Sequence, residues 1–115
     1  MLLPWRAAGS VERVVSLNLC TDQWLVLRAP EKVVGLSALA RDPALSFVAE
    51  RAARLPRVRT SAEAVMAGQP ELILGARFGA RTTLGLLGLA GLKVTRIDLP
   101  TDFPGIRTAL RDPPR

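Results

Sequence analysis

The feature that most constrains the fold is a recurring unit of a short apolar stretch, a polar loop and a segment with helical periodicity. The first unit begins at residues 13–23, RVVSLNLCTDQ. Such apolar stretches are typical of parallel strands that helices cover on both faces. The repeat therefore predicts an α/β fold, a three-layer sandwich with a mainly parallel sheet of about four or five strands. Ligands of such sheets bind over the carboxyl ends of the strands, so we expect functional residues in the loops that follow them.

The apolar stretches also predict where the strands lie. We expect strands over residues 14–19, 32–36, 71–75 and 93–99, and a short extended piece over residues 57–59. The first strand should be central in the sheet, because Val14, Val15 and Leu17 make both of its faces apolar. Right-handed crossovers then place helices on both sides of the sheet.

Capping signals predict the helices between these strands. We expect Thr21 to cap the first helix, with Asp22 in its first turn, where the helix dipole favours a carboxylate. Asp42 followed by proline predicts the start of a second helix, whose apolar stripe consists of Leu45, Val48, Ala49 and Ala52. Thr60 and Glu63 have the spacing of a capping box at the start of a third helix. Two more helices are expected, over residues 80–90 and from residues 102–104 to residues 112–114.

Composition excludes several classes of active site. The chain of 115 residues contains no His and no Tyr, and Cys20 is its single cysteine. Ser-His-Asp and Cys-His catalysis are therefore excluded. A His-ligated metal site, a zinc cluster and an internal disulfide are excluded for the same reason. We accordingly expect no enzyme activity, no metal site and no cofactor.

The charge of the chain does not point to nucleic acid. The formal net charge is +6, from 16 basic and 10 acidic residues, but the arginines are scattered singly and are not interleaved with aromatic residues. No uncharged stretch approaches the ~20 residues that a membrane-spanning helix needs. We expect residues 1–11 to be a residual leader or a disordered N-terminus, because small residues follow a short apolar start without a basic leader.

Two further patterns favour structural interpretations. Gly85, Gly88 and Gly91 lie within or at the end of an expected helix rather than at a strand-to-helix turn, so close packing on the sheet is favoured over a dinucleotide site. The carboxylates that could work as an acid–base pair are Asp22, Asp42, Glu63, Glu71, Asp98 and Asp102. Three of them lie at helix starts, where capping explains them, and Asp98 has no obvious partner.

Four residues in the expected loops suggest a binding site. Cys20 follows the first strand, Arg41 follows the second, and Arg77 and Phe78 follow the strand at residues 71–75. Each has a simpler interpretation, since a free cysteine is often a small buried apolar residue and exposed arginines are usually solvated. Together they favour a site for an anionic or aromatic ligand.

Four stretches of the chain also resemble a known family. They are RVVSLNLCTDQ, KVVGLSALARDP, TSAEAVMAGQPELILGARFG and GLKVTRIDLP, in this order. Across residues 12–111 they resemble the amino-terminal lobe of the helical-backbone class of ABC-transporter substrate-binding proteins, the periplasmic proteins for cobalamin, ferric siderophores and haem. The resemblance implies one lobe of a two-lobed periplasmic protein, with a metal chelate or tetrapyrrole as ligand and ABC permease subunits as partners.

The resemblance also implies roles for particular residues. Those that match the family's three ligand loops are Asn18, Leu19, Cys20, Leu39, Arg41, Arg77 and Phe78. Glu63 matches the glutamate that docks on the permease, and its alternative role is the capping box with Thr60. The aromatic residues that cobalamin binders often have in the second and third loops are missing, and Leu39 and Ala76 stand near those positions.

The function implied by the resemblance is non-covalent capture of an iron complex, haem or corrinoid for an ABC importer. The alternatives are a flavodoxin-like α/β enzyme or regulatory domain and, ranked lower, a basic nucleic-acid-binding domain. Since the family's second lobe is not in this sequence, we expect a truncated chain. Its exposed half-site would favour self-association.

Overall fold

Four parallel strands form the centre of the protein. The computed structural model describes residues 11–76 and 81–97, and the four strands lie within these ranges. The strands are β1 (Val14–Ser16), β2 (Val33–Gly35), β3 (Leu72–Ala76) and β4 (Val94–Ile97), in the order β2-β1-β3-β4. Every neighbouring pair is parallel, so the predicted sheet and the central place of the first strand are confirmed.

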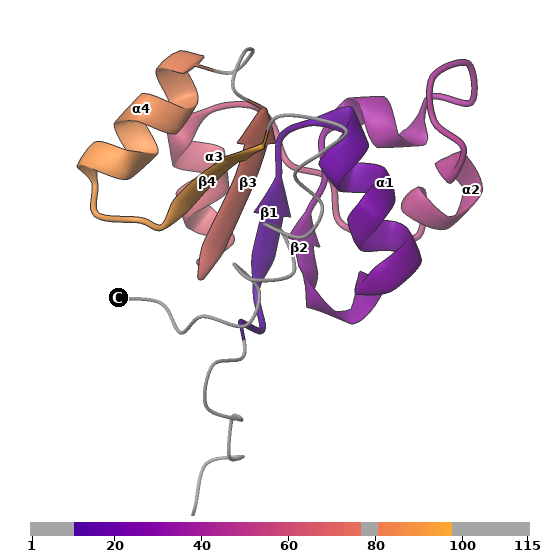
Figure 1. Ribbon diagram of the computed structural model, residues 1–115, viewed down its shortest axis with the longest axis horizontal. Coiled ribbons are helices and arrows are strands. Elements are labelled where there is room, and N and C mark those ends of the chain that lie inside the picture. The colour runs from indigo at the N-terminus through magenta and orange to yellow at the C-terminus, as the bar shows by residue number, and fades with distance from the viewer. Residues whose placement is uncertain (1–10, 77–80, 98–115) are drawn as a thin grey trace, which may run out of the picture.

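Helices cover both faces of this sheet, as Figure 1 shows. One face carries α1 (Leu19–Arg28) and α2 (Ala49–Ala52), and the other carries α3 (Ala62–Ala67) and α4 (Arg81–Leu89). Two short 3-10 helices, η1 (Pro30–Lys32) and η2 (Ala38–Arg41), flank β2. The described residues therefore form the predicted three-layer α/β sandwich.

The core consists of two apolar layers, one on each face of the sheet. Val14, Leu72 and Leu74 pack with α1 in the first layer, whereas Val15 and Ile73 pack with α3 and α4 in the second. The side chains alternate in this way because successive residues of a strand point to opposite faces. Full burial of each such side chain contributes about 1.5–3 kcal/mol, which is why most residues of the two central strands are apolar.

β1 is shorter than predicted because the first helix begins earlier. Asn18, not Thr21, caps α1: its Oδ1 accepts the N–H groups of Cys20 at 2.9 Å and Thr21 at 3.3 Å. The Thr21 hydroxyl instead donates back to the carbonyl of Asn18 at 3.0 Å. Leu19 therefore belongs to α1 rather than to the strand.

The second helix is also shorter than predicted, since α2 begins only at Ala49. Before it, Gln23 Oε1 accepts the N–H of Phe47 at 2.8 Å, and Ser46 Oγ accepts that of Val48 at 3.2 Å. Side-chain acceptors of this kind compete with the helical hydrogen-bond pattern. Leu45, expected on the buried stripe, is 49% exposed.

The start of α3 differs from the predicted capping box by one residue. Ser61, not Thr60, is the N-cap, and its Oγ accepts the N–H of Ala64 at 3.2 Å. Glu63 is therefore the second residue of the helix, whereas the box needs a glutamate at the third. The capping-box interpretation of Glu63 is wrong, and its side chain is exposed.

The predicted close packing of the α4 glycines is wrong as well. A Cβ on Gly85 or Gly88 would meet nothing within 4 Å, because α4 faces the sheet through Leu84 and Leu87 instead. Gly91 has a φ of +88°, which suits glycine at the end of a helix.

Several predicted segments lie outside the described residues or are reduced in the structure. The expected extended piece at residues 57–59 is a single parallel bridge between Leu36 and Arg57. The last residues of the strand expected at 93–99, the helix expected after residues 102–104, and residues 1–10 lie outside the described part of the chain.

Candidate functional site

The strand order defines the position of the candidate binding site. The chain leaves β1 for β2 on one side and then crosses back to β3 on the other side of β1. Sheets of this kind bind ligands where the strand order reverses, over the carboxyl ends of the two diverging strands. The candidate site therefore lies over the ends of β1 and β3, at the edge from which α1 departs (Figure 1).

The turn after β1 contributes three of the predicted ligand residues. Cys20 is a free and exposed thiol in the first turn of α1. Leu19 is half-buried beside it. Asn18 is half-buried too, but its side-chain oxygen is occupied by the helix cap, which leaves it a structural role in the turn.

The loop after β2 contributes Leu39 and Arg41, which lie on η2. Leu39 is 47% exposed, while Ala40 between the two is fully buried and anchors the loop. The guanidinium of Arg41 donates to the carbonyl of Leu55 at 2.7 Å. This contact holds Arg41 toward the end of α2. Arg77 and Phe78, the residues predicted for the third loop, lie outside the described residues.

A polar contact that the sequence did not predict joins these two loops. Asp22, expected only as a favourable charge in the first turn of α1, is fully buried. Its Oδ1 accepts the N–H of Ser37 at 3.3 Å, and its Oδ2 accepts the Ser37 hydroxyl. Burial raises the pKa of Asp22 from 3.8 to about 6, although hydrogen bonds from Ser16 and Ser37 act in the opposite direction.

Glu63 lies on α3, an element that carries none of the other predicted site residues. The bridge between Leu36 and Arg57 brings the chain back to the end of β2, and α3 starts soon afterwards. Glu63 is exposed in the first turn of that helix. An exposed carboxylate at this place is free to contact another protein.

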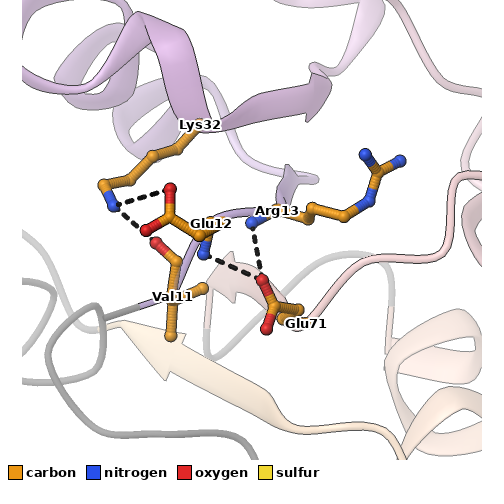
Figure 2. Close-up of polar contacts among 5 residues, drawn as sticks. All are labelled: Val11, Glu12, Arg13, Lys32 and Glu71. Carbon is orange, nitrogen blue, oxygen red and sulfur yellow. Dashed lines mark hydrogen bonds and ion pairs between the residues drawn. The ribbon is translucent and has the colours of Figure 1, made fainter. Parts of the chain in front are cut away.

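Glu71 precedes β3, at the end of the strands opposite to the candidate site, and its side chain accepts hydrogen bonds from the backbone before β1 (Figure 2). Its Oε1 accepts the N–H groups of Glu12 at 2.9 Å and Arg13 at 3.1 Å. Next to it, Lys32 Nζ donates to the carbonyl of Val11 at 2.5 Å and lies 3.8 Å from Glu12 Oε2. These contacts join the starts of β1 and β3 and give Glu71 a structural role rather than the acid–base role considered from the sequence.

A separate depression lies away from the candidate site. It has a volume of about 390 Å³ and lies between the end of α1 and α2. Its lining includes Leu27, Phe47 and Val48 but none of the predicted ligand residues. Phe47 at its rim is 97% exposed.

The described residues contain neither a candidate metal cluster nor a candidate membrane-spanning helix. In residues 11–76 and 81–97, no group of three or more His, Cys, Asp or Glu side chains is placed to hold a metal ion. None of the helices in these ranges is long and apolar enough to span a membrane. Asp98 and Asp102 lie outside them.

Solved structures identify the fold. No protein-family model and no curated protein matches the chain. A periplasmic haem-binding protein from Pseudomonas aeruginosa is 27% identical over 76% of this chain, with a TM-score of 0.61. The periplasmic haem-binding protein RhuT from Roseiflexus sp. RS-1 is 30% identical over 74%, with a TM-score of 0.59. The haem-binding protein HmuT shares the fold at 20% identity over 90%, with a TM-score of 0.67.

The match covers about a third of each of these structures, namely 31%, 33% and 37% of their chains. It agrees with the four sequence stretches and with a parallel sheet that corresponds to a single lobe. In sequence motifs and in fold, the chain is a relative of the amino-terminal lobe of the periplasmic solute-binding proteins of the helical-backbone class.

Proposed function

We propose that this chain is the solute-binding component of an ABC importer and contributes one wall of the site for an iron complex, haem or another tetrapyrrole. The reversal of strand order between β1 and β3 is the observation that carries the proposal, because Leu19, Cys20 and Leu39 follow strands at the edge where such sheets bind ligands. The similarity to periplasmic haem-binding proteins supports the ligand class. The chemistry is capture without a covalent step.

The largely apolar surface of the candidate site suits a flat ligand. Leu39 and the thiol of Cys20 offer exposed apolar or polarizable surface. The polar groups next to them are already bonded within the protein, as the cap of Asn18 and the contact of Arg41 with Leu55 show. Contact with the face of a large ring would therefore contribute more than hydrogen bonds from this edge.

Titration of the purified chain with haem, cobalamin and several ferric siderophores tests the proposal. A receptor that binds at ~1 nM has a binding free energy of about −12 kcal/mol, and half of that corresponds to tens of micromolar. We therefore expect micromolar binding of one ligand class, observed as a change in its absorbance spectrum and as heat in calorimetry. Absence of binding of every ligand at ~1 mM would contradict the proposal.

Two matched leucine variants locate the ligand. Leu39→Gln changes an exposed leucine at the candidate site, and Leu27→Gln changes an exposed leucine at the separate depression. We expect the first to weaken binding about tenfold, which corresponds to about 1.4 kcal/mol, and the second to leave it unchanged. The reverse order would place the ligand in the depression between α1 and α2.

Docking on a permease is the second part of the proposal. Glu63 is exposed on α3 and does not serve the helix cap, so its charge is available for a cationic pocket on a membrane partner. Glu63→Gln should leave ligand binding unchanged and weaken association with the permease by about 2–5 kcal/mol. Glu50→Gln, at an exposed glutamate of α2, is the control. Equal effects of the two variants would exclude a specific role of Glu63.

The proposed location is the periplasm, the compartment named for the similar structures. Fractionation of cells that produce the natural gene product tests it, with the chain expected among proteins released by osmotic shock. Recovery with cytoplasmic marker proteins alone would contradict the location.

A further inference from the structure

A buried polar cluster lies beneath the ligand edge, the part of the candidate site formed by Leu19 and Cys20 after β1 and by Leu39 and Arg41 after β2. It consists of Ser16 at the end of β1, Thr21 and Asp22 in the first turn of α1, and Ser37 after β2. The first three are fully buried and Ser37 is 6% exposed. Apolar side chains would fill such a space without the cost of removing a carboxylate from water. A polar cluster here therefore calls for a role beyond packing.

The cluster connects the two ligand loops through an unbroken chain of hydrogen bonds. The hydroxyls of Ser16 and Thr21 lie 2.5 Å apart, so one donates to the other. Both lie within hydrogen-bond distance of the Asn18 carbonyl, at 3.2 Å and 3.0 Å, and this carbonyl also accepts the N–H of Asp22 at 2.8 Å. Asp22 then accepts both the N–H and the hydroxyl of Ser37. Among the described residues, no buried side-chain nitrogen or oxygen lacks a partner.

Ser37 is the point from which the second loop is positioned. It precedes η2 as its N-cap, yet its side chain makes no capping hydrogen bond to that helix, because the hydroxyl is directed to Asp22. The backbone of η2 continues from the same residue, with Ala40 N–H donating to the Ser37 carbonyl at 3.2 Å. A displacement of Ser37 would therefore displace Leu39 with it.

We propose that Asp22 is the positioning residue of the ligand edge: its buried carboxyl group bonds to Ser37 and thereby fixes the loop of Leu39 and Arg41 against the turn of Leu19 and Cys20. Asp22 is buried and acts through Ser37 rather than through contact with the ligand. What the positioned loop binds rests on the function proposed above. The positioning itself is a property of the free protein.

Opening of this loop is coupled to hydration of the carboxylate. When the loop is closed, burial holds the pKa of Asp22 near 6, whereas a hydrated aspartate has a pKa of 3.8. The closed state therefore binds a proton more tightly than the open state. Loop opening should become easier as the pH rises from about 4 to about 6, by up to about tenfold per pH unit, and should level off above that range.

No charged neighbour complicates this coupling in the described part of the chain. The charged side chains on the elements that pack against α1 are Glu31, Lys32, Arg41, Glu50 and Arg51. Lys32 binds the carbonyl of Val11, Arg41 binds that of Leu55, and the other three are exposed. Burial and the hydrogen bonds from serines are the causes of the shifted pKa of Asp22.

Amide hydrogen exchange of the free protein, measured between pH 4.5 and pH 7.5, tests the inference. The reporters are the N–H groups of Ser37, Ala40 and Asp42, which bond to Asp22, Ser37 and Leu39. After correction for the intrinsic exchange rate, their protection should fall by about thirtyfold between these two pH values.

Asp22→Asn removes the titration while keeping the shape and the oxygen that accepts the Ser37 N–H, so the pH dependence of the reporters should disappear. Asp42→Asn is the matched control, because Asp42 lies in the same loop and only closes a local turn onto Ala44. Ser37→Ala, which leaves the carboxylate and removes one of its donors, should raise reporter exchange at every pH. An unchanged pH dependence in Asp22→Asn would overturn the inference.

Ligand titrations separate this inference from the proposed function. If a ligand binds, wild-type affinity should vary with pH across the range in which Asp22 titrates, and Asp22→Asn affinity should not. If no ligand binds, the proposed function fails, and the exchange experiment still decides whether Asp22 fixes the loop. Binding with the same pH profile in both proteins would overturn the positioning role.

Discussion

Replacement of Asp22 by asparagine should change how the stability of the whole protein depends on pH. The carboxyl is fully buried, and its pKa is raised from 3.8 to about 6. In this range the folded chain binds more protons than the unfolded chain, so stability is greatest at low pH and is lost as the pH rises. The pKa difference of about 2 units corresponds to about 3 kcal/mol of unfolding free energy.

The assay is urea unfolding of wild type and Asp22→Asn at half-unit steps from pH 4 to pH 7.5. The free energy of unfolding of wild type should decrease by about 3 kcal/mol relative to the variant over this interval. A comparison between the two proteins is needed because every other titrating group contributes equally to both. Parallel profiles would refute the reasoning, and so would a wild type that gains stability relative to the variant as the pH rises.

Unfolding experiments also test two other features of the fold. A Cβ on Gly35 would lie 2.8 Å from Val58 Cβ, so Gly35→Ala should cost about 1–3 kcal/mol. Gly85→Ala, which meets nothing within 4 Å inside a helix, should stabilise by up to about 1 kcal/mol, and equal effects of the two variants would contradict the packing described. Ser61→Ala should cost about 1 kcal/mol and Glu63→Gln less than about 0.5 kcal/mol in urea, because Ser61 is the cap of α3. A larger loss of stability in Glu63→Gln than in Ser61→Ala would support the capping box instead.

The sheet was predictable because its signal is local and strong. Val14 and Val15 are adjacent and both apolar, a pattern typical of a strand that is covered on both faces. The structure places them in different core layers and puts β1 between β2 and β3. The apolar stretch at Leu72–Ala76 was recognised for the same reason, with a difference of one residue at its ends.

The helix starts were predicted less well because neighbouring residues compete for the same role. Asn18 and Thr21 both suit a cap, and the choice depends on Ser16, whose hydroxyl engages Thr21 from the end of the strand. The start of α2 depends on Gln23, which accepts a hydrogen bond from the loop that precedes that helix. Propensity alone contains no information about such contacts between distant residues.

The positions of some residues of the candidate site could be predicted, but the hydrogen bonds that hold its loops could not. Cys20 lies in the first turn of α1, directly after β1, and Leu39 lies on η2 after β2, so both follow the strands as predicted. Asp22 was expected only to favour the helix dipole, since its bond to Ser37 exists only when β1 and β2 pair side by side. The contact of Arg41 with the carbonyl of Leu55 likewise depends on where the chain returns after η2.

The pairing of β1 with β3 imposes an order of events on synthesis of the chain. Val14 pairs with Leu72 and Ser16 with Leu74, so one side of β1 has no partner until the ribosome has released the segment around residue 74. At about 5–20 residues per second, the interval lasts on the order of 3–10 s. During that time the edge of an apolar strand can pair with other chains, which makes the nascent protein a candidate substrate for chaperones.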